Sequence, residues 1–394
     1  MSQRQIFLQH QAQTSDFPLM LEIESAKGIY LYQPDGKKII DLISGISVSN
    51  VGHSHPKVVK AVQKQVKRHM HLMVYGELIQ SPQTALAHAL VQTLPTSLDN
   101  VFFVNSGSEA IEGAMKLAKR YTGRTEIVSC FRAYHGSTHG ALSIGGGEYF
   151  KRNFRPLLPD IRQIYFGVEA ELEKITEKTA CFIVETVQGE AGVRTACSRY
   201  WKAVRQRCNE TGALLILDEI QCGFGRTGKF WAFEHYGIVP DIVVTAKAMG
   251  GGMPLGAFIA SKEIMSVLKN NPILGHITTF GGHPVSCAAS LASLRIIQEK
   301  KLLSEVAHKA ELFKQLLHHS TIREVRNAGL MIAVEFDNFE ILQKIIQKAL
   351  QLGVLTDWFL YCDNSMRIAP PLIITKKQIQ KACDRILKAI QLAT

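Results

Sequence analysis

The sequence predicts an α/β protein with one large domain and one smaller domain, and three observations carry this prediction. Between residues 100 and 260, short runs that are apolar on both faces alternate with helical patterns, which is typical of a largely parallel sheet covered by helices on both sides. Beyond residue 286, long helical patterns enclose a few extended runs, which is typical of a separate α+β unit. The 394 residues also exceed the length that one hydrophobic core usually supports, about 250 to 300 residues.

The N-terminal region contains a predicted β-hairpin. The stretch GIYLYQPDGKKIIDLIS, residues 28–44, has two extended runs around Pro-Asp-Gly. These three residue types are typical of the tight turn between two antiparallel strands. We expect residues 1–50 to pack with the C-terminal unit, residues 286–394, and residues 51–285 to form the large domain.

Six apolar runs supply strands of the large domain. They are VFFV (101–104), EIVSC (126–130), CFIVET (181–186), LLILDE (214–219), DIVVTA (241–246) and GAFIAS (256–261). Helical patterns between them fit the crossover connections of a parallel sheet. In the C-terminal unit, a long helical pattern is followed by REVRNAGLMIAVEF (323–336), by another helix, and by SMRIAPPLIIT (365–375).

The composition excludes several classes of protein. The formal net charge is +11, but lysine and arginine are spread along the chain, so we expect a solvated basic surface and no nucleic-acid partner. No stretch approaches the roughly eighteen apolar residues of a membrane span, and the first residues lack a signal-peptide pattern. We therefore expect a cytoplasmic protein with no membrane partner.

Neither cysteine nor histidine is spaced for a metal site. The eight cysteines are never closer than eleven residues, which excludes CxxC spacing and predicts reduced thiols. The histidines of GHSHP and HMH have no third ligand at a credible spacing, so we expect no metal.

Ligands of open parallel sheets bind beyond the carboxyl ends of the strands, so we searched those ends for chemistry. After the first strand, Asn105, Ser106, Gly107 and Ser108 begin an amphipathic helix. Backbone N–H groups and hydroxyls at the positive end of a helix favour a phosphate group. The alternative is an ordinary helix cap with Glu109 as its capping-box partner.

Two charged residues stand at later strand ends. Asp218 ends the run LLILD, where a buried cation is its natural partner and a surface helix cap is the alternative. Lys247 follows DIVVTA and precedes three glycines. A lysine removed from water has a lowered pKa and can form an imine with a carbonyl, and the glycines leave room for a flat ligand. A lysine that extends into solvent is the alternative.

An aromatic residue completes the set. Tyr134 and His135 come just after the run EIVSC, where a ring can stack on a planar ligand or simply pack in the core. A phosphate cradle, an acid for a ring cation, an aromatic lid and an imine-forming lysine are the four requirements of pyridoxal 5'-phosphate (PLP). We therefore expect PLP as the cofactor, with Lys247 and Asp218 as the catalytic residues.

An ordered set of motifs extends over nearly the whole chain. It runs from GIYLYQPDGKKIIDLISGISVSNVGHSHP through NSGSEA, ETVQGEAG, LDEIQCGFGRTG and TAKAMGGGMPLGA to TTFGGHP and MRIAPPL. In these motifs the chain resembles the class III PLP-dependent aminotransferases of fold type I, which include the ornithine, acetylornithine and 4-aminobutyrate enzymes. The resemblance implies a mostly parallel seven-stranded sheet covered by helices, and a smaller α+β domain built from both termini. It also implies a ping-pong reaction that moves a terminal amino group from an amine or diamino acid to 2-oxoglutarate.

The resemblance assigns roles to single residues as well. Lys247 forms the imine with the cofactor, Asp218 pairs with the pyridinium nitrogen, and Gln221 reaches the ring hydroxyl. Tyr134 and Ile220 enclose the ring. The implied cofactor-binding set is Ser106, Gly107, Ser108, Tyr134, His135, Glu185, Asp218, Ile220, Gln221, Lys247 and Thr279. Thr279 comes from the partner subunit, so the resemblance implies an obligatory homodimer with shared active sites.

The resemblance also implies how substrates are bound. Glu190 pairs with Arg367, which binds the α-carboxylate of glutamate or 2-oxoglutarate and swings aside for the other substrate. Ser137 stands where related enzymes usually have an arginine that binds the donor carboxylate. The two substrate tyrosines of the ornithine enzyme fall on Ile46 and near Asp16. Without the planar arginine we do not expect true ornithine or 4-aminobutyrate specificity, and Asp16 is an alternative receiver for a distal ammonium group.

Two other functions remain open from the sequence. GFGRTG, residues 223–228, matches GxGxxG, and LLILDE resembles the acidic strand of ATPases, so an NAD- or ATP-binding enzyme is one alternative. Glu219, Ile220, Gln221 and Cys222 lie between Asp218 and the first glycine, and no ribose-binding acid follows about twenty residues on, which disfavours it. The other alternative is a non-catalytic binding module on the same fold, which predicts loss of Lys247 or Asp218, yet both are present.

Overall fold

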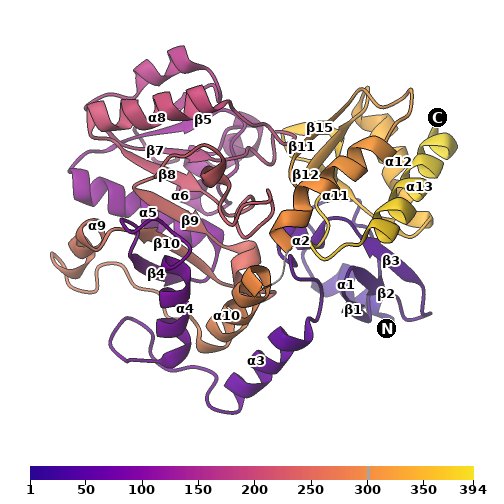
Figure 1. Ribbon diagram of the computed structural model, residues 1–394, viewed down its shortest axis with the longest axis horizontal. Coiled ribbons are helices and arrows are strands. Elements are labelled where there is room, and N and C mark those ends of the chain that lie inside the picture. The colour runs from indigo at the N-terminus through magenta and orange to yellow at the C-terminus, as the bar shows by residue number, and fades with distance from the viewer. Residues whose placement is uncertain (300–301) are drawn as a thin grey trace.

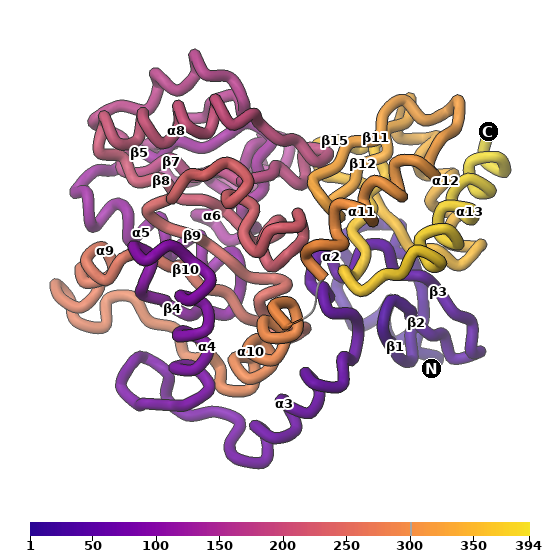
Figure 2. Tube along the Cα trace, in the orientation of Figure 1, coloured from indigo at the N-terminus to yellow at the C-terminus, as the bar shows by residue number. Residues whose placement is uncertain are grey.

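The computed structural model describes residues 1–299 and 302–394, which form two bodies side by side (Figure 1). The larger body is built around one wide sheet, and the smaller body contains both ends of the chain. The tube in Figure 2 shows the N-terminal strands lying beside the C-terminal helices. Both termini therefore contribute to the smaller body, as the sequence predicts.

The large sheet has seven strands and is mostly parallel. Their spatial order is β4 (Asn100–Val104), β10 (Gly256–Ala260), β9 (Ile242–Thr245), β8 (Leu214–Asp218), β7 (Thr179–Glu185), β5 (Glu126–Cys130) and β6 (Ile161–Ile164). Strand β10 pairs antiparallel with β4 and β9, and the remaining pairs are parallel. Every residue of β7 to β10 is buried, which explains their continuous apolar runs. The predicted fold class is confirmed.

Helices cover both faces of this sheet (Figure 1). Neighbouring residues of one strand, such as Leu215 and Ile216, belong to hydrophobic cores on opposite faces because side chains alternate along a strand. One face packs against α5 (Gly107–Thr122), and the other against α8 (Ser198–Thr211) and α10 (Pro284–Glu299). The remaining helices of this body are α3 (Pro56–Val66), α4 (Ser81–Val91), α6 (His139–Ile144), α7 (Glu148–Lys151) and α9 (Lys262–Ser266). Short 3-10 turns are η1 (Arg152–Phe154), η2 (Glu169–Lys174), η3 (Ala232–His235), η4 (Lys247–Gly250) and η5 (Val267–Lys269).

Helix α10 lies with the large sheet, whereas the sequence analysis assigned residues 286–299 to the C-terminal unit. It packs against α3 and α4, and its Cys287, Leu294 and Ile297 belong to the core of the large sheet. A helical pattern shows which face is apolar, but it does not show which core that face covers. We propose α10 as the last helix of the large domain.

The smaller body combines two four-stranded sheets with helices from both ends of the chain. One sheet has the order β1 (Ser25–Lys27), β2 (Tyr30–Tyr32), β3 (Lys38–Asp41), β13 (Val354–Leu355), and the other β11 (Glu324–Ala328), β12 (Met331–Glu335), β15 (Cys362–Ile368), β14 (Asp357–Phe359). The helices are α1 (Gln3–His10), α2 (Ser44–Ser47), α11 (Leu302–Leu316), α12 (Phe339–Gln351) and α13 (Lys376–Ala393). Strands β2 and β3 form the predicted hairpin, and β3 pairs in parallel with β13. Ile40 and Leu42 share a core with Ile332 and Ile386, so the first strands pack with the C-terminal unit.

No helix in the described ranges is long and apolar enough to cross a membrane.

Candidate active site

A cavity of about 390 Å³ opens at the carboxyl ends of the central strands. It lies between the start of α5, the loop after β5, the segment after β8 and the turn that follows β9. Most of the predicted cofactor residues line it, namely Ser106, Gly107, Ser108, Tyr134, His135, Glu185, Asp218, Ile220, Gln221 and Lys247. Val48, from the N-terminal segment, also lines the cavity and was not predicted.

The start of α5 combines a helix cap with a free helix end. Ser106 Oγ accepts a hydrogen bond from Glu109 N at 3.2 Å, and Glu109 Oε2 accepts one from Asn105 N at 2.8 Å. The serine cap offered as an alternative is therefore present, but Glu109 pairs with Asn105 N and not with the N–H of Ser106, so it is not the capping-box partner. The cap uses Glu109 N and leaves the N–H groups of Gly107 and Ser108, which line the cavity, with no acceptor inside their own helix. Capping and phosphate binding are compatible here.

The loop after β5 approaches this helix end very closely. Gly136 has a φ of 126°, and a Cβ at this position would lie 2.1 Å from Ser108 Oγ. Ser137 N donates a hydrogen bond to that same oxygen at 3.3 Å. Only glycine allows this approach, which brings Tyr134 and the start of α5 to one cavity.

Asp218 is buried and is paired with a histidine. Its Oδ2 lies 2.7 Å from His135 Nδ1, and its Oδ1 accepts a hydrogen bond from Ile220 N at 2.9 Å. Burial opposes the charged form of His135, but the hydrogen bond and charge of Asp218 outweigh it and raise the pKa of His135. The other ring nitrogen, His135 Nε2, is buried with no hydrogen-bond partner among the described residues.

Lys247 follows β9 and begins the 3-10 turn η4 with a φ of 47°. Within the described ranges, its Nζ makes no hydrogen bond or ion pair, although it lines the cavity. Burial lowers the pKa of Lys247, while the charges of Glu190 and Asp218 oppose that effect. An amine with a lowered pKa is more often neutral and therefore nucleophilic.

Glu185 joins two loops of the site. Its Oε1 accepts a hydrogen bond from Tyr134 N at 2.9 Å, and its Oε2 accepts one from Gly189 N at 3.0 Å. Burial raises the pKa of Glu185 to about 7, with His135 opposing the rise and Asp218 adding to it. The carboxyl group thereby links the loop that carries Tyr134 with the loop that carries Glu190.

Glu190 and Arg367 form a buried, two-pronged ion pair beyond the cavity. Arg367 Nη1 donates to Glu190 Oε1 at 2.6 Å, and Nη2 donates to Oε2 at 2.9 Å. Burial alone would raise the pKa of Glu190, but Arg367 outweighs it and lowers that pKa. The pair that the family resemblance implies is thus brought together from two domains, since Glu190 follows β7 and Arg367 lies in β15.

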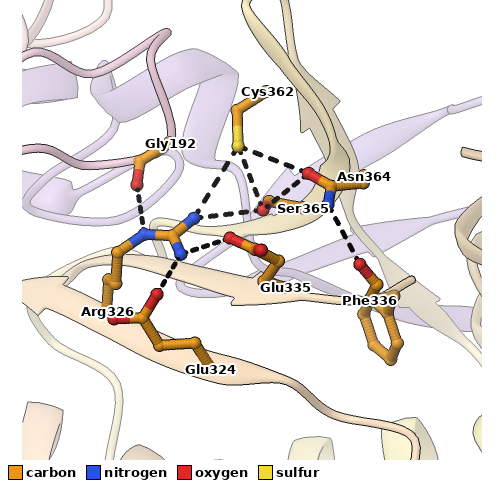
Figure 3. A network of polar contacts seen from close by, with 8 residues as sticks. All are labelled: Gly192, Glu324, Arg326, Glu335, Phe336, Cys362, Asn364 and Ser365. Atoms are coloured by element: carbon orange, nitrogen blue, oxygen red, sulfur yellow. Dashed lines mark hydrogen bonds and ion pairs between the residues drawn. The ribbon is translucent and has the colours of Figure 1, made fainter. Parts of the chain in front are cut away.

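A second arginine holds the loop of Glu190 against the smaller body (Figure 3). Arg326, in β11, donates to Gly192 O at 3.0 Å and to Ser365 Oγ at 3.2 Å, and it pairs with Glu335. Gly192 has a φ of 84°, and a Cβ there would lie 2.7 Å from Cys362 Sγ. The sequence analysis missed Arg326, because an arginine in an alternating strand carries no signal of its own.

Several predicted positions lie outside the cavity. Thr279 is exposed, and Ile46 is half-buried with a φ of 61°. Ser137 is exposed, but its hydroxyl lies 3.2 Å from Tyr134 Oη. Asp16 is exposed on the N-terminal segment, so this structure gives it no contact with the cavity. Ile46 and Asp16 were placed by counting along motifs, which does not locate loops in space, whereas Thr279 was expected to reach the partner's cavity and not its own.

The GFGRTG segment joins the two bodies. Arg226 is fully buried and donates to Leu330 O at 3.2 Å and Ser44 Oγ at 3.4 Å, and also to Pro370 O and Asn50 Oδ1. In the described residues, no group of three or more His, Cys, Asp or Glu is placed to hold a metal ion.

The residues of the cavity fit PLP, because they offer a helix N-terminus, a buried acid paired with His135 and an amine with no polar partner among the described residues. The sequence model of the family described as aminotransferase class-III matches residues 11–390. The chain belongs to the class III aminotransferases. It is therefore a PLP-dependent transaminase, and neither the NAD- or ATP-binding reading nor the non-catalytic module is favoured.

Comparisons with individual proteins support the same family. The chain is 40% identical over 391 residues to the acetylornithine aminotransferase of Methanocaldococcus jannaschii, covering 95% of each chain. Its structure is similar to a transaminase from the marine bacterium Virgibacillus, with a TM-score of 0.93, 28% identity, and coverage of 99% and 98% of the two chains. It is also similar to the ornithine aminotransferase of Toxoplasma gondii, with a TM-score of 0.90, 28% identity, and coverage of 99% and 94%, in a structure described as having partial occupancy of PLP.

Proposed function

We propose that Lys247 carries the cofactor, and that the enzyme takes a terminal amino group from an amine or diamino acid and gives it to 2-oxoglutarate. The observation that supports this most is the amine of Lys247. It has no polar partner in the described ranges and opens onto the cavity that contains the Asp218–His135 pair. A lysine with a structural role would be expected to pair with a carboxylate or to reach solvent.

Each wall of the cavity has a part in the proposal. When bound, PLP supplies a ring that withdraws electrons from the substrate carbon. Gly107 and Ser108 would bind its phosphate with their N–H groups, Tyr134 and Ile220 would enclose its ring, and Gln221 would bind the ring hydroxyl. Asp218, paired with His135, would hold the protonated ring nitrogen. Lys247 Nζ, with its lowered pKa, accepts and returns the proton during the exchange.

We infer that substrates meet two different surfaces, a charged one at Arg367 and an uncharged one at Ser137. Arg367 offers a planar, two-pronged site for the carboxylate of glutamate or 2-oxoglutarate, which Glu190 fills in this structure. On the other side, Ser137 replaces the usual arginine and bonds with Tyr134. We infer a donor of the ornithine, acetylornithine or lysine type that is not held by an arginine clamp at position 137.

We also propose that the active unit is a homodimer. Two segments expose large apolar side chains: Met70 is 65% and Ile79 is 95% exposed, and Ile273 is 74% and Phe280 is 52% exposed. Such apolar surface on a chain of this size supports burial against another subunit. Thr279, the residue proposed to reach the partner's phosphate site, is in the same segment as Ile273 and Phe280.

Replacement of Lys247 tests the chemistry directly. We expect the purified protein with PLP to show a visible absorption band that disappears in Lys247→Ala, because the covalent attachment is lost. The half-reaction with a primary amine should slow by about 10²- to 10⁴-fold. Donors to compare are ornithine, acetylornithine, lysine, 4-aminobutyrate, diaminobutyrate and putrescine. Lys229→Ala, at an exposed lysine, is the matched control; an unchanged band in Lys247→Ala would refute the assignment.

A further inference from the structure

The four residues of α2 have a backbone conformation that is rare for their residue types. Their φ angles are 45° at Ser44, 64° at Gly45, 61° at Ile46 and 63° at Ser47. Positive φ favours glycine and is unusual for a residue branched at Cβ, such as isoleucine. A turn of this kind persists only where the surrounding structure fixes it.

Polar contacts fix both ends of this turn. At its start, Asp41 Oδ1 accepts a hydrogen bond from Ser44 N at 2.8 Å, and Ser44 Oγ donates to Ala369 O at 2.7 Å. Beyond its end, Asn50 Nδ2 donates to Phe224 O at 2.9 Å. The turn is therefore attached to parts of the chain that are distant in sequence.

Arg226 of the GFGRTG segment connects the contacts at the two ends. Its Nη2 donates to Ser44 Oγ at 3.4 Å and to Asn50 Oδ1. Its Nη1 donates to Leu330 O at 3.2 Å and to Pro370 O. A guanidinium group is a planar fork of N–H donors, so it can reach four oxygens at once, whereas the ammonium group of lysine is a single point.

Arg226 is a buried cation without an acid in contact. Its partners in the described ranges are carbonyl, amide and hydroxyl oxygens, and its Nε has no hydrogen-bond partner there. Burial lowers the pKa of Arg226 to about 9, and the charge of Asp41 opposes that effect. Apolar residues often fill a buried site at a lower cost than a charge does. Packing alone therefore does not explain an arginine here.

The turn lies against the active site. It packs against η4, which begins with Lys247. Val48 directly follows the turn, donates a hydrogen bond from its N–H to Ser44 O at 2.8 Å, and lines the cavity. Under the proposed function, other residues are assigned to the phosphate, the ring and the reactive amine. Val48 is left as an apolar surface for the substrate.

Arg226 also touches the segment that carries Arg367, since Pro370 follows Arg367 by three residues. That segment has other attachments. Arg367 pairs with Glu190, and its Nε lies 3.0 Å from Asp357 Oδ1, which is opposite it across the pair of β14 and β15. Replacement of Arg226 should therefore affect the turn more than the carboxylate site.

We propose that Arg226 is a positioning residue that holds the turn of Ser44–Ser47, and that it thereby keeps Val48 in place as a surface that limits the length of the amino donor. This inference rests on the proposed function, because it takes the cavity as the place where the donor reacts. It also gives the GFGRTG segment a role other than nucleotide binding.

Hydrogen exchange of the PLP-loaded, full-length enzyme tests the positioning step without measuring activity. We expect Arg226→Lys to raise the exchange rates of N–H groups in residues 42–50 about tenfold or more, because lysine keeps the charge but cannot reach all four oxygens. Arg124→Lys is the matched control, since Arg124 donates to Thr179 O at 3.0 Å and Thr211 O at 2.9 Å, and Thr179 is at the amino end of β7, away from the cavity. The control should leave exchange in residues 42–50 unchanged.

Donor length tests the consequence for the substrate. The half-reaction is compared for ornithine and lysine, and for 4-aminobutyrate and 5-aminopentanoate, because the members of each pair differ by one methylene group. We expect Val48→Ala to raise the relative kcat/KM of the longer donor about tenfold. Arg226→Lys should have a similar effect, and combining the two substitutions should add little, because Val48 is then already displaced. The KM for 2-oxoglutarate should stay the same.

Unchanged exchange in residues 42–50 of Arg226→Lys, or additive effects of the two substitutions on the length preference, would overturn the inference. If Arg226→Lys does not fold, Ser44→Ala removes the hydroxyl that joins Arg226 to Ala369 O and should give the same two changes at a smaller size. No change in Ser44→Ala would overturn the inference equally. If the unsubstituted enzyme gave no cofactor band and reacted with no donor of either pair, the proposed function would fall, and the exchange rates would still show whether Arg226 holds the turn.

Discussion

The carboxylate of Asp218 is buried, and it is paired with the ring of His135 at 2.7 Å. Their pairing offsets part of the cost of burial, because each provides a polar partner for the other, while His135 Nε2 has no partner among the described residues. The same logic applies to Glu185, whose two oxygens accept backbone N–H groups from two loops. At this scale the site is a set of buried charges that are positioned before the cofactor binds.

Replacement of His135 should separate this pre-positioning from catalysis. We expect His135→Asn to weaken PLP binding about tenfold or more, since the amide can keep a hydrogen bond to Asp218 but cannot carry the positive charge, a loss of about 1–3 kcal/mol. Titration of the cofactor-free protein with PLP measures this. His139→Asn, at an exposed histidine that contacts only backbone carbonyl groups, is the control. Unchanged PLP affinity in His135→Asn would contradict the assigned role.

The contribution of the Asp218–His135 pair to the stability of the cofactor-free protein should depend on pH. The folded-state pKa of His135 is raised above the unfolded value of about 6.5, so its contribution is complete below that pH and is lost as the pH rises through the folded pKa. The difference in Tm between the unsubstituted protein and His135→Asn should therefore be largest below about pH 6.5. A difference that grows with rising pH would be inconsistent with the raised pKa.

At the scale of elements, the cavity depends on how closely the loop after β5 meets the start of α5. We expect Gly136→Ala to lower the free energy of unfolding by about 2 kcal/mol and to weaken PLP binding, because the new Cβ would overlap Ser108 Oγ at 2.1 Å. Gly123→Ala is the matched control, since Gly123 also has a positive φ, 69°, but has open space around it. It should cost about 1 kcal/mol and leave PLP affinity unchanged. Denaturant unfolding and PLP titration measure both effects, and equal PLP affinities would argue against the close approach as the cause.

The elements also show which features a sequence can reveal. Strands buried on both faces, such as β7 and β8, were predictable because their residues are apolar without interruption. Strand β6 was missed because it is an edge strand with the polar residues Arg162 and Gln163, so it has no apolar run. A short edge strand of this kind becomes visible only when its partner is known.

Some residues of the candidate site could be predicted from local motifs in the sequence, and others could not. Lys247 and the residues of the helix start occur in local motifs whose chemistry is readable from the sequence. Val48, Arg326 and Asp357 act through contacts with distant parts of the chain, so no local pattern marks them. Arg367 was found through its motif, but the acid across the strand pair required the register of β14 and β15.

At the scale of the whole molecule, the site is completed across a domain boundary. Glu190 belongs to the large domain and Arg367 to the smaller one, and the two side chains form an ion pair. Arg326, also in the smaller domain, donates a hydrogen bond to Gly192 O in the loop that carries Glu190. Arg226 adds a second connection by binding carbonyl groups of Leu330 and Pro370. A relative movement of the two bodies would therefore change the carboxylate site directly.

The proposed dimer extends this dependence to a second copy of the chain. We expect Ile79→Asp and Ile273→Asp to convert the protein to monomers at micromolar concentration, because burying unpaired carboxylates at an interface costs several kcal/mol. Their affinity for PLP should fall together with the dimer, since Thr279 would no longer reach the phosphate site of the partner.

Sedimentation and PLP titration of the same samples link assembly to cofactor binding. Leu392→Asp, at an exposed apolar residue of the C-terminal helix, is the control and should remain dimeric with normal PLP affinity. Monomeric variants that bind PLP as tightly as the unsubstituted protein would show that each chain holds the phosphate alone. The role proposed for Thr279 would then be refuted, because a residue exposed on its own subunit could contribute only through the partner.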